Sequence, residues 1–234
     1  PNSAEGINRI FKDGKGYWIG LSSRVRVIIF NKNLVKQSEV PNSIYDLLNP
    51  KWKGKCAIAN PLFGTTSFHI AALFTELGDD KANEFLNGLK QNDVLIATSN
   101  GDVKKRVADG EIAFGIVDTD DAITAMREGK PVGMIFPDQQ GIGSLIVPNA
   151  VSLINNSPNS ENGKILIDYL LSTEAEMQLA KLAAQIPMFK TDYQIPEMPV
   201  IQNINDIKSM NIDYEKAAAK LEEIQPLLKK WLEQ

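Results

Sequence analysis

Short apolar runs and longer amphipathic segments alternate along the first two thirds of the chain. Helical spacing of apolar residues predicts helices at residues 43–50, 66–78, 80–92, 101–110 and 120–129. Near-continuous apolar runs predict strands covered on both faces, at residues 24–31, 55–60, 94–98, 112–117, 132–137 and 144–154. Strands that alternate with helices indicate an α/β protein with a largely parallel sheet.

The last third of the sequence is mainly helical. Residues 160–185 predict two consecutive helices, the second beginning at Thr173 as N-cap, with Glu176 closing a capping box. A proline-rich connector follows at residues 186–199. The apolar stripe of residues 213–234 predicts an amphipathic terminal helix.

Composition narrows the classes of protein that the chain can belong to. Its 234 residues suffice for two modest domains or one large one. The net charge of −4 and the dispersed basic residues argue against a nucleic-acid partner. No apolar run is long enough to span a bilayer, and no signal sequence is in this chain, which leaves export with a cleaved signal open.

One cysteine and one histidine restrict the chemistry further. Cys56 alone cannot form an intrachain disulfide, and its apolar surroundings predict a buried, inert thiol. A zinc site of cysteines and histidines is nearly excluded. A Ser-His-Asp triad would require His69, whose run "FHIAALF" favours a packing role.

Two strand-to-helix junctions carry side chains suited to an anion. Ligands of open α/β sheets bind where strands end and helices begin. After the strand at 55–60, Gly64 permits close backbone approach, and Thr65, Thr66 and Ser67 offer hydroxyls at a helix N-terminus. Asn100 occupies the junction after the strand at 94–98. Simple N-capping is the alternative reading at both places.

A third junction carries three carboxylates. Asp118 as N-cap and Asp121 in the first turn would both interact favourably with the helix dipole. That account leaves Asp120 unexplained. On the strand at 24–31, Arg24 and the arginine two residues later lie on one face, and each requires a carboxylate or a bound anion. A structural salt bridge is expected for at least one of them.

Five segments, in an order and spacing that span nearly the whole chain, carry a family resemblance. They are "GLSSRVRVIIFN" (20–31), "LLNPKWKGKCAIANP" (47–61), "VADGEIAFGIV" (107–117), "VPNAVSLI" (147–154) and "LIDYLLSTEAEMQLA" (166–180). The chain resembles bacterial periplasmic solute-binding proteins of ABC importers, in particular the ferric-ion-binding group. The resemblance implies a two-lobed α/β clamshell of type II, with a ligand held in the cleft between the lobes.

The resemblance also implies how the chain is divided. Residues 1–23 and 147–197 would form lobe I, and residues 24–146 and 198–234 would form lobe II. The family begins with further strands and helices that have no counterpart here, so lobe I is expected to be incomplete and the N-terminal part missing. The sheet face at residues 147–154 should then be partly uncovered.

Site residues carry over position by position. In the ferric binders an anion rests on the helix N-terminus aligned with Gly64–Ser67, near an asparagine aligned with Asn100 and an arginine aligned with Arg24. Two adjacent tyrosines hold the iron, and this chain has Asp120-Asp121 in their place. Carboxylates are hard ligands that also take Fe³⁺, Mg²⁺ or Ca²⁺. The candidate ligand-binding residues are Ser22, Arg24, Gly64, Thr65, Thr66, Ser67, Asn100, Asp118, Asp120 and Asp121, of which Asp120 and Asp121 are also candidate metal ligands.

The expected function is solute capture without chemistry. A monomeric periplasmic or extracytoplasmic protein, with a lipoprotein anchor left open, would hand a small polar ligand to its membrane permease. The ligand is expected to be Fe³⁺ with a synergistic anion, or alternatively an organic anion or zwitterion such as phosphate, a phosphonate or an amino acid. A hydrolase using Asp120 or Asp121 as general base, and a sensor domain, are the other readings. The sequence has no nucleophile motif.

Overall fold

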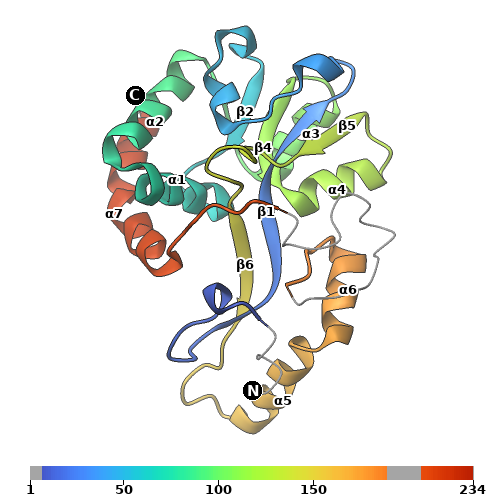
Figure 1. Cartoon of the computed structure of the whole chain (residues 1–234), viewed down its shortest axis with the longest axis vertical. Helices are drawn as coiled ribbons and strands as arrows, with labels where there is room; N and C mark the ends of the chain where they lie inside the picture. Colours follow the sequence, from blue (N-terminus) through green and yellow to red (C-terminus); the bar gives the residue numbers. More distant parts are fainter. Residues whose placement is uncertain (1–6, 189–206, 234) are drawn as a thin grey trace. The chain divides into compact units, whose positions relative to one another are not determined.

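The computed structural model describes residues 7–188 and 207–233 (Figure 1). The chain divides into two compact units. Unit 1 comprises residues 1–25 and 146–207, and unit 2 comprises residues 26–145 and 208–234. The first two changes of unit lie within two residues of the lobe boundaries expected from the resemblance, and the third lies ten residues later.

Unit 2 is built on a five-stranded sheet. Its strand order is β3-β2-β4-β1-β5, in which β2 pairs in parallel with β3 and β4, and β1 pairs antiparallel with β4 and β5. The strands are β1 (Ile19–Asn31), β2 (Cys56–Ala59), β3 (Leu95–Ala97), β4 (Phe114–Asp118) and β5 (Val132–Ile135). The expectation of a largely parallel sheet is therefore wrong. Near-continuous apolar runs report burial on both faces, but they do not report strand direction.

Five α-helices belong to the described part of unit 2. They are α1 (Gly64–Leu77), α2 (Asp79–Gln91), α3 (Asn100–Ala108), α4 (Thr119–Arg127) and α7 (Tyr214–Glu233). Three 3₁₀ turns, at Gln37–Glu39, Ile44–Leu48 and Pro50–Trp52, lie between β1 and β2. The terminal helix α7 packs along α1, far away in the sequence (Figure 1). The indole N–H of Trp231 donates to the Leu86 carbonyl at 3.1 Å, which fixes the end of α7 against α2.

The core of unit 2 lies on both faces of the sheet. In β1 the side chains of Val27, Ile28 and Ile29 are completely buried, as a central strand covered by two layers requires. Close packing of α3 on the sheet depends on Gly115, where a Cβ would lie 2.5 Å from Val103 Cγ1 and 2.7 Å from the Ala57 oxygen. No larger residue fits there without displacing backbone.

Unit 1 is thinner. The first part of β1 pairs antiparallel with β6 (Ile146–Val151), and α5 (Ser160–Leu170) and α6 (Thr173–Ala183) complete its described helices, with a 3₁₀ turn at Arg9–Phe11. The hydroxyl of Ser172 caps α6 by accepting from Ala175 N at 3.2 Å, so Thr173 is not the N-cap. With Ser172 as N-cap, the third helical position is Ala175, so Glu176 does not stand where a capping box requires it. The Glu176 carboxylate accepts from the buried Met188 N–H at 2.6 Å.

Apolar side chains remain exposed in unit 1. Helix α5 contains no buried residue. Its large apolar side chains Ile165, Leu166 and Tyr169 are 68, 56 and 49% exposed. No residue between 147 and 154 is buried, which agrees with a sheet face left uncovered in this chain. Among the described helices, none has the length and apolar character that crossing a membrane requires.

Candidate ligand-binding site

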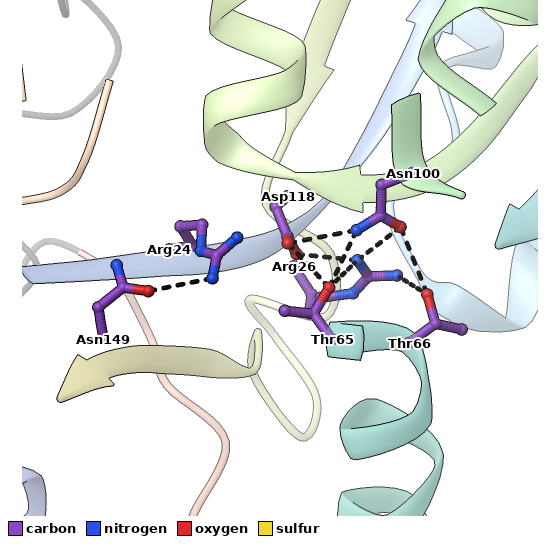
Figure 2. A network of polar contacts seen from close by, with 7 residues as sticks. All are labelled: Arg24, Arg26, Thr65, Thr66, Asn100, Asp118 and Asn149. Atoms are coloured by element: carbon purple, nitrogen blue, oxygen red, sulfur yellow. Dashed lines mark hydrogen bonds and ion pairs between the residues drawn. The ribbon is translucent and has the colours of Figure 1, made fainter. Parts of the chain in front are cut away.

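Three strand-to-helix junctions meet at one edge of the unit 2 sheet. Strands β3, β2 and β4 are parallel neighbours, so their carboxyl ends lie together. The helices α1, α3 and α4 begin shortly after these strands and point their N-termini to the same edge. The candidate residues Thr65, Thr66, Asn100 and Asp118, which come from these three junctions, are brought together there (Figure 2).

Arg26 lies at the centre of this group. Because β1 runs antiparallel to β4, the register places Arg26 opposite Asp118. Arg26 Nη1 lies 2.8 Å from Asp118 Oδ1 in an ion pair. The same nitrogen donates to Thr65 Oγ1 at 3.1 Å and Asn100 Oδ1 at 3.2 Å, and Nη2 donates to Thr66 Oγ1 at 3.1 Å. One guanidinium thus ties the starts of α1, α3 and α4 together.

The other carboxylate oxygen of Asp118 is also held. The hydroxyl of Thr65 donates to Asp118 Oδ2 at 2.8 Å, and the amide of Asn100 donates to the same oxygen at 3.2 Å. Asn100 Nδ2 also donates to Thr65 Oγ1 at 2.9 Å. We call these five residues, Arg26, Thr65, Thr66, Asn100 and Asp118, the Arg26 network (Figure 2).

The ion pair at the centre of this network is buried. The side chains of Arg26 and Asp118 are 1% and 2% exposed. Two charges in the interior are stable only when they are paired and hydrogen-bonded, as these are. The nearby ring of His69 responds to the same surroundings, because burial, and then the charge of Arg26, lower its pKa to about 3. His69 is therefore a neutral packing residue, in agreement with the sequence.

Asp118 is not the capping residue that the sequence predicts. It occupies the N-cap position of α4, but its side chain makes no capping hydrogen bond. The carboxylate is instead bonded to Arg26, Thr65 and Asn100. An ion pair in a low-dielectric interior outweighs one hydrogen bond to a helix N–H.

An acidic side adjoins the network. Ligand oxygens of Asp118, Asp120 and Asp121 lie within 4.8 Å of one another. Burial, followed by the charges of Asp120 and Asp118, raises the pKa of Asp121 to about 6, and Lys104 Nζ lies 4.0 Å from its carboxylate. Carboxylate oxygens suit hard cations, but Asp118 already shares its charge with Arg26. Asp120 and Asp121 are the carboxylates better placed to meet a cationic ligand.

The N-terminus of α1 lacks a side-chain cap. Its N-cap residue, Phe63, makes no capping hydrogen bond, and no acidic residue stands in its first turn. Gly64 has φ of +59°, with open space where a Cβ would be, so glycine allows the turn into this helix. The hydroxyl of Ser67 accepts from Gln225 Nε2 at 3.1 Å and links α1 to α7. Within this turn the backbone N–H groups are better placed for a ligand than Ser67 Oγ.

Ser22 and Arg24 belong to a separate network in unit 1. Arg24 Nη2 donates to Asn149 Oδ1 at 3.0 Å (Figure 2). Asn149 Nδ2 in turn donates to Ser22 Oγ at 2.9 Å and to Gln185 Oε1 at 2.5 Å. Arg24 is therefore tied to Asn149, and through it to Ser22 and Gln185.

Three residues of these networks are absent from the predicted set. Arg26 was recognised from the sequence only as a charge in need of a partner, and its partner Asp118 depends on an antiparallel pairing that the sequence did not predict. Asn149 and Gln185 join the unit 1 network through contacts between distant segments, and no sequence signal marked either residue. Cys56 is buried as predicted, and burial raises the pKa of its thiol to about 12.

Comparison with known proteins shows the family of this chain. Residues 2–210 match the family of bacterial extracellular solute-binding proteins, and the chain belongs to this family. Iron uptake protein A1 of Synechocystis is 28% identical over 184 residues, which is 74% of this chain and 50% of that protein. A putative 2-aminoethylphosphonate-binding periplasmic protein of Salmonella typhi is 28% identical over 207 residues, 87% of this chain and 56% of that protein.

Solved structures show the same fold. A Trichodesmium protein (IdiA, FutA) in complex with iron and citrate superposes with a TM-score of 0.85 at 23% identity, covering 99% of this chain and 75% of that one. The fold is therefore that of the type II periplasmic binding proteins. The chain spans about half the length of the curated relatives described above.

Proposed function

We propose that this protein captures a small polar solute outside the cytoplasmic membrane and delivers it to the permease of an ABC importer, without catalysing a reaction. The observation that carries the proposal is the convergence of three strand-to-helix junctions on one edge of the unit 2 sheet, in a chain of the solute-binding family. We expect a monomer that acts in the periplasm or on the outer face of the membrane.

Unit 2 offers two kinds of ligand group. The uncapped first turn of α1, with Gly64, Thr65 and Thr66, suits an anionic end of the ligand. Asp120 and Asp121 suit a cationic end. Burial, and then the negative charges of Asp120 and Asp118, raise the pKa of Asp121, and Lys104 offsets this effect only in part. Ser22, Arg24, Ser67, Asn100 and Asp118 also remain candidate ligand residues, although the side chain of each is hydrogen-bonded within the protein, as those of Thr65 and Thr66 are.

Ferric iron is the leading ligand class. Relatives named for iron uptake and ferric-iron binding support it, and the hard oxygens of Asp120 and Asp121 are suitable donors. Iron would be cargo, held with an anion at α1. With carboxylates in place of the family's tyrosines, the iron-loaded protein should lack the visible charge-transfer band of tyrosinate.

A zwitterion is the second candidate. The Asp120-Asp121 pair adjoins the uncapped turn of α1 through the Arg26 network, so a cation-seeking group and an anion-seeking group belong to the same edge of the sheet. A relative named for 2-aminoethylphosphonate binding supports this reading. Such a ligand would place its ammonium at the carboxylates and its phosphonate at α1.

Calorimetric titration of the full chain with ferric citrate, inorganic phosphate and 2-aminoethylphosphonate tests the proposal. We expect saturable binding of one of them, with at least tenfold weaker binding by Asp121→Asn. Lys81→Gln, which changes an exposed charge on α2, serves as the matched control and should bind as the unchanged protein does. No saturable binding by any of the three, or equal binding by Asp121→Asn, would contradict the proposal.

A further inference from the structure

The Asp118 carboxylate is bound as a ligand anion would be. One oxygen accepts from a guanidinium, Arg26 Nη1, at 2.8 Å. The other accepts from a hydroxyl, Thr65 Oγ1, at 2.8 Å and from an amide, Asn100 Nδ2, at 3.2 Å. A guanidinium, a hydroxyl and an amide at the edge of a helix N-terminus are the donors that proteins use for carboxylates and phosphates.

This shell is built independently of the helix that Asp118 begins. The Asp118 side chain forgoes capping α4, and the donors around it come from β1, α1 and α3. Arg26 is completely buried, and its Nε lies in the interior without an acceptor among the described residues. An arginine in this position demands a negative charge, whatever its source.

From this geometry we propose that Asp118 is the built-in anion of the site. Its carboxylate neutralises Arg26 and organises the starts of α1, α3 and α4, a role that a free anion would otherwise fill. Next to the helix N-terminus at which the resemblance expects a synergistic anion, this chain supplies a carboxylate of its own at the end of β4. Capture of the solute in unit 2 therefore needs no free anion to neutralise Arg26. This last consequence rests on the proposed function.

The proposal predicts a socket for a small carboxylate when the Asp118 side chain is removed. Asp118→Gly deletes the carboxylate and leaves Arg26, Thr65 and Asn100 around the vacated space. Acetate or formate from solution should bind there, because each carries the same charged group in the same size. At ten times its Kd, acetate should raise the Tm of Asp118→Gly by about 3–6 °C through mass action.

Three controls make the measurement specific. Asp118→Asn keeps the shape of the side chain and fills the socket, so acetate should leave its Tm unchanged. Asp121→Gly removes a carboxylate that has no such shell among the residues that the structure describes, and it should not respond either. Sodium chloride at equal ionic strength separates binding from screening. The unchanged protein should show no saturable shift with acetate.

The result on Asp118→Gly decides the proposal. A saturable rise in Tm with acetate, confined to that variant, supports it. The absence of such a rise, or the same rise in the unchanged protein, overturns it. Should Asp118→Gly fail to fold in chloride, refolding with and without acetate gives the readout, and failure to recover folded protein with acetate also overturns it.

The experiments can contradict the proposed function and the role of Asp118 independently of each other. Acetate rescue needs no solute, so it tests the built-in anion even when every candidate solute fails to bind. Conversely, solute binding by the unchanged protein together with no acetate rescue would leave the proposed function intact and remove only the role assigned to Asp118.

Discussion

Unit 2 and unit 1 use the same kinds of residues and bury them to different degrees. Unit 2 buries a five-stranded sheet between helices and places a fully paired arginine inside it. Among its described residues, unit 1 has one pair of strands and a helix, α5, without a single buried side chain. Unit 1 also has more exposed large apolar side chains than unit 2, although the structure describes fewer than half as many residues in unit 1 as in unit 2.

The difference shows where the stability of this chain comes from. Apolar area removed from water is the main favourable term in folding. Leu166 is 56% exposed on α5, whereas Leu73 on α1 is 1% exposed. Most of the stabilisation must therefore come from unit 2, and substitutions of equal chemistry should have unequal effects in the two units.

The largest effect should follow from breaking the ion pair inside unit 2. Arg26→Met leaves Asp118 buried without its cation, and we expect a loss of about 3–5 kcal/mol in the free energy of unfolding. Urea denaturation measures it. The double variant Arg26→Met with Asp118→Leu should regain a large part of the loss, because no charge is then buried. A loss below about 1 kcal/mol for Arg26→Met would contradict the comparison.

A smaller loss should follow from crowding the sheet of unit 2. Gly115→Ala places a methyl group 2.5 Å from Val103 Cγ1 and 2.7 Å from the Ala57 oxygen, so we expect about 1–3 kcal/mol of destabilisation. Thermal unfolding of this variant and of its control measures the loss. Gly101→Ala, in α3 with its nearest neighbour 3.6 Å away, is the control and should be neutral or stabilising by up to about 1 kcal/mol.

The pH dependence of unit 2 should reveal His69. Its folded pKa of about 3 lies below the ordinary value of 6.5, so the unfolded chain binds the proton more readily between these values. Stability must then fall as the pH drops below 6.5, by about 2 kcal/mol at pH 5 from this residue. Comparison with His69→Gln, whose amide does not titrate, isolates the effect. Identical slopes for the two proteins would show that the ring is protonated as in water.

The smallest effect on stability should come from the surface of unit 1. Ile165→Lys on α5 changes a side chain that is 68% exposed, and we expect less than about 0.5 kcal/mol. Binding of a hydrophobic dye and self-association should both decrease, because the apolar patch shrinks. Lys164→Ser, next to it on the same helix, should alter neither. A loss above about 1 kcal/mol for Ile165→Lys would mean that this face is covered.

The sequence predicted much of the fold from local patterns. The periodicity of apolar residues predicted the position of every described α-helix and strand, because an element with one or two apolar faces has a characteristic spacing of apolar residues. The direction of β1 leaves no such record, and the antiparallel register that pairs Arg26 with Asp118 could not be read. At α6, Ser172 and Thr173 are both good N-caps, so the pattern could not decide between them.

The candidate site shows the same limit. The three junctions were predictable, because parallel strands bring their carboxyl ends together. Which of their side chains bond to one another was not, since Thr65, Asn100 and Asp118 come from three different segments and meet only through Arg26. Asp118 looked like a helix cap from its local sequence, and only the arriving strand β1 gives it another partner.

The length of β1 has a consequence for how this sequence can change by insertion or deletion. One strand of 13 residues pairs with β6 through its first half, with a register shift between Gly20 and Ser22, and with β4 and β5 through its second half. Because a one-residue slip in a strand turns every following side chain to the opposite face, a single added or lost codon here would invert Arg26. Length variation should be confined to the loops, and β1 should accept substitutions only.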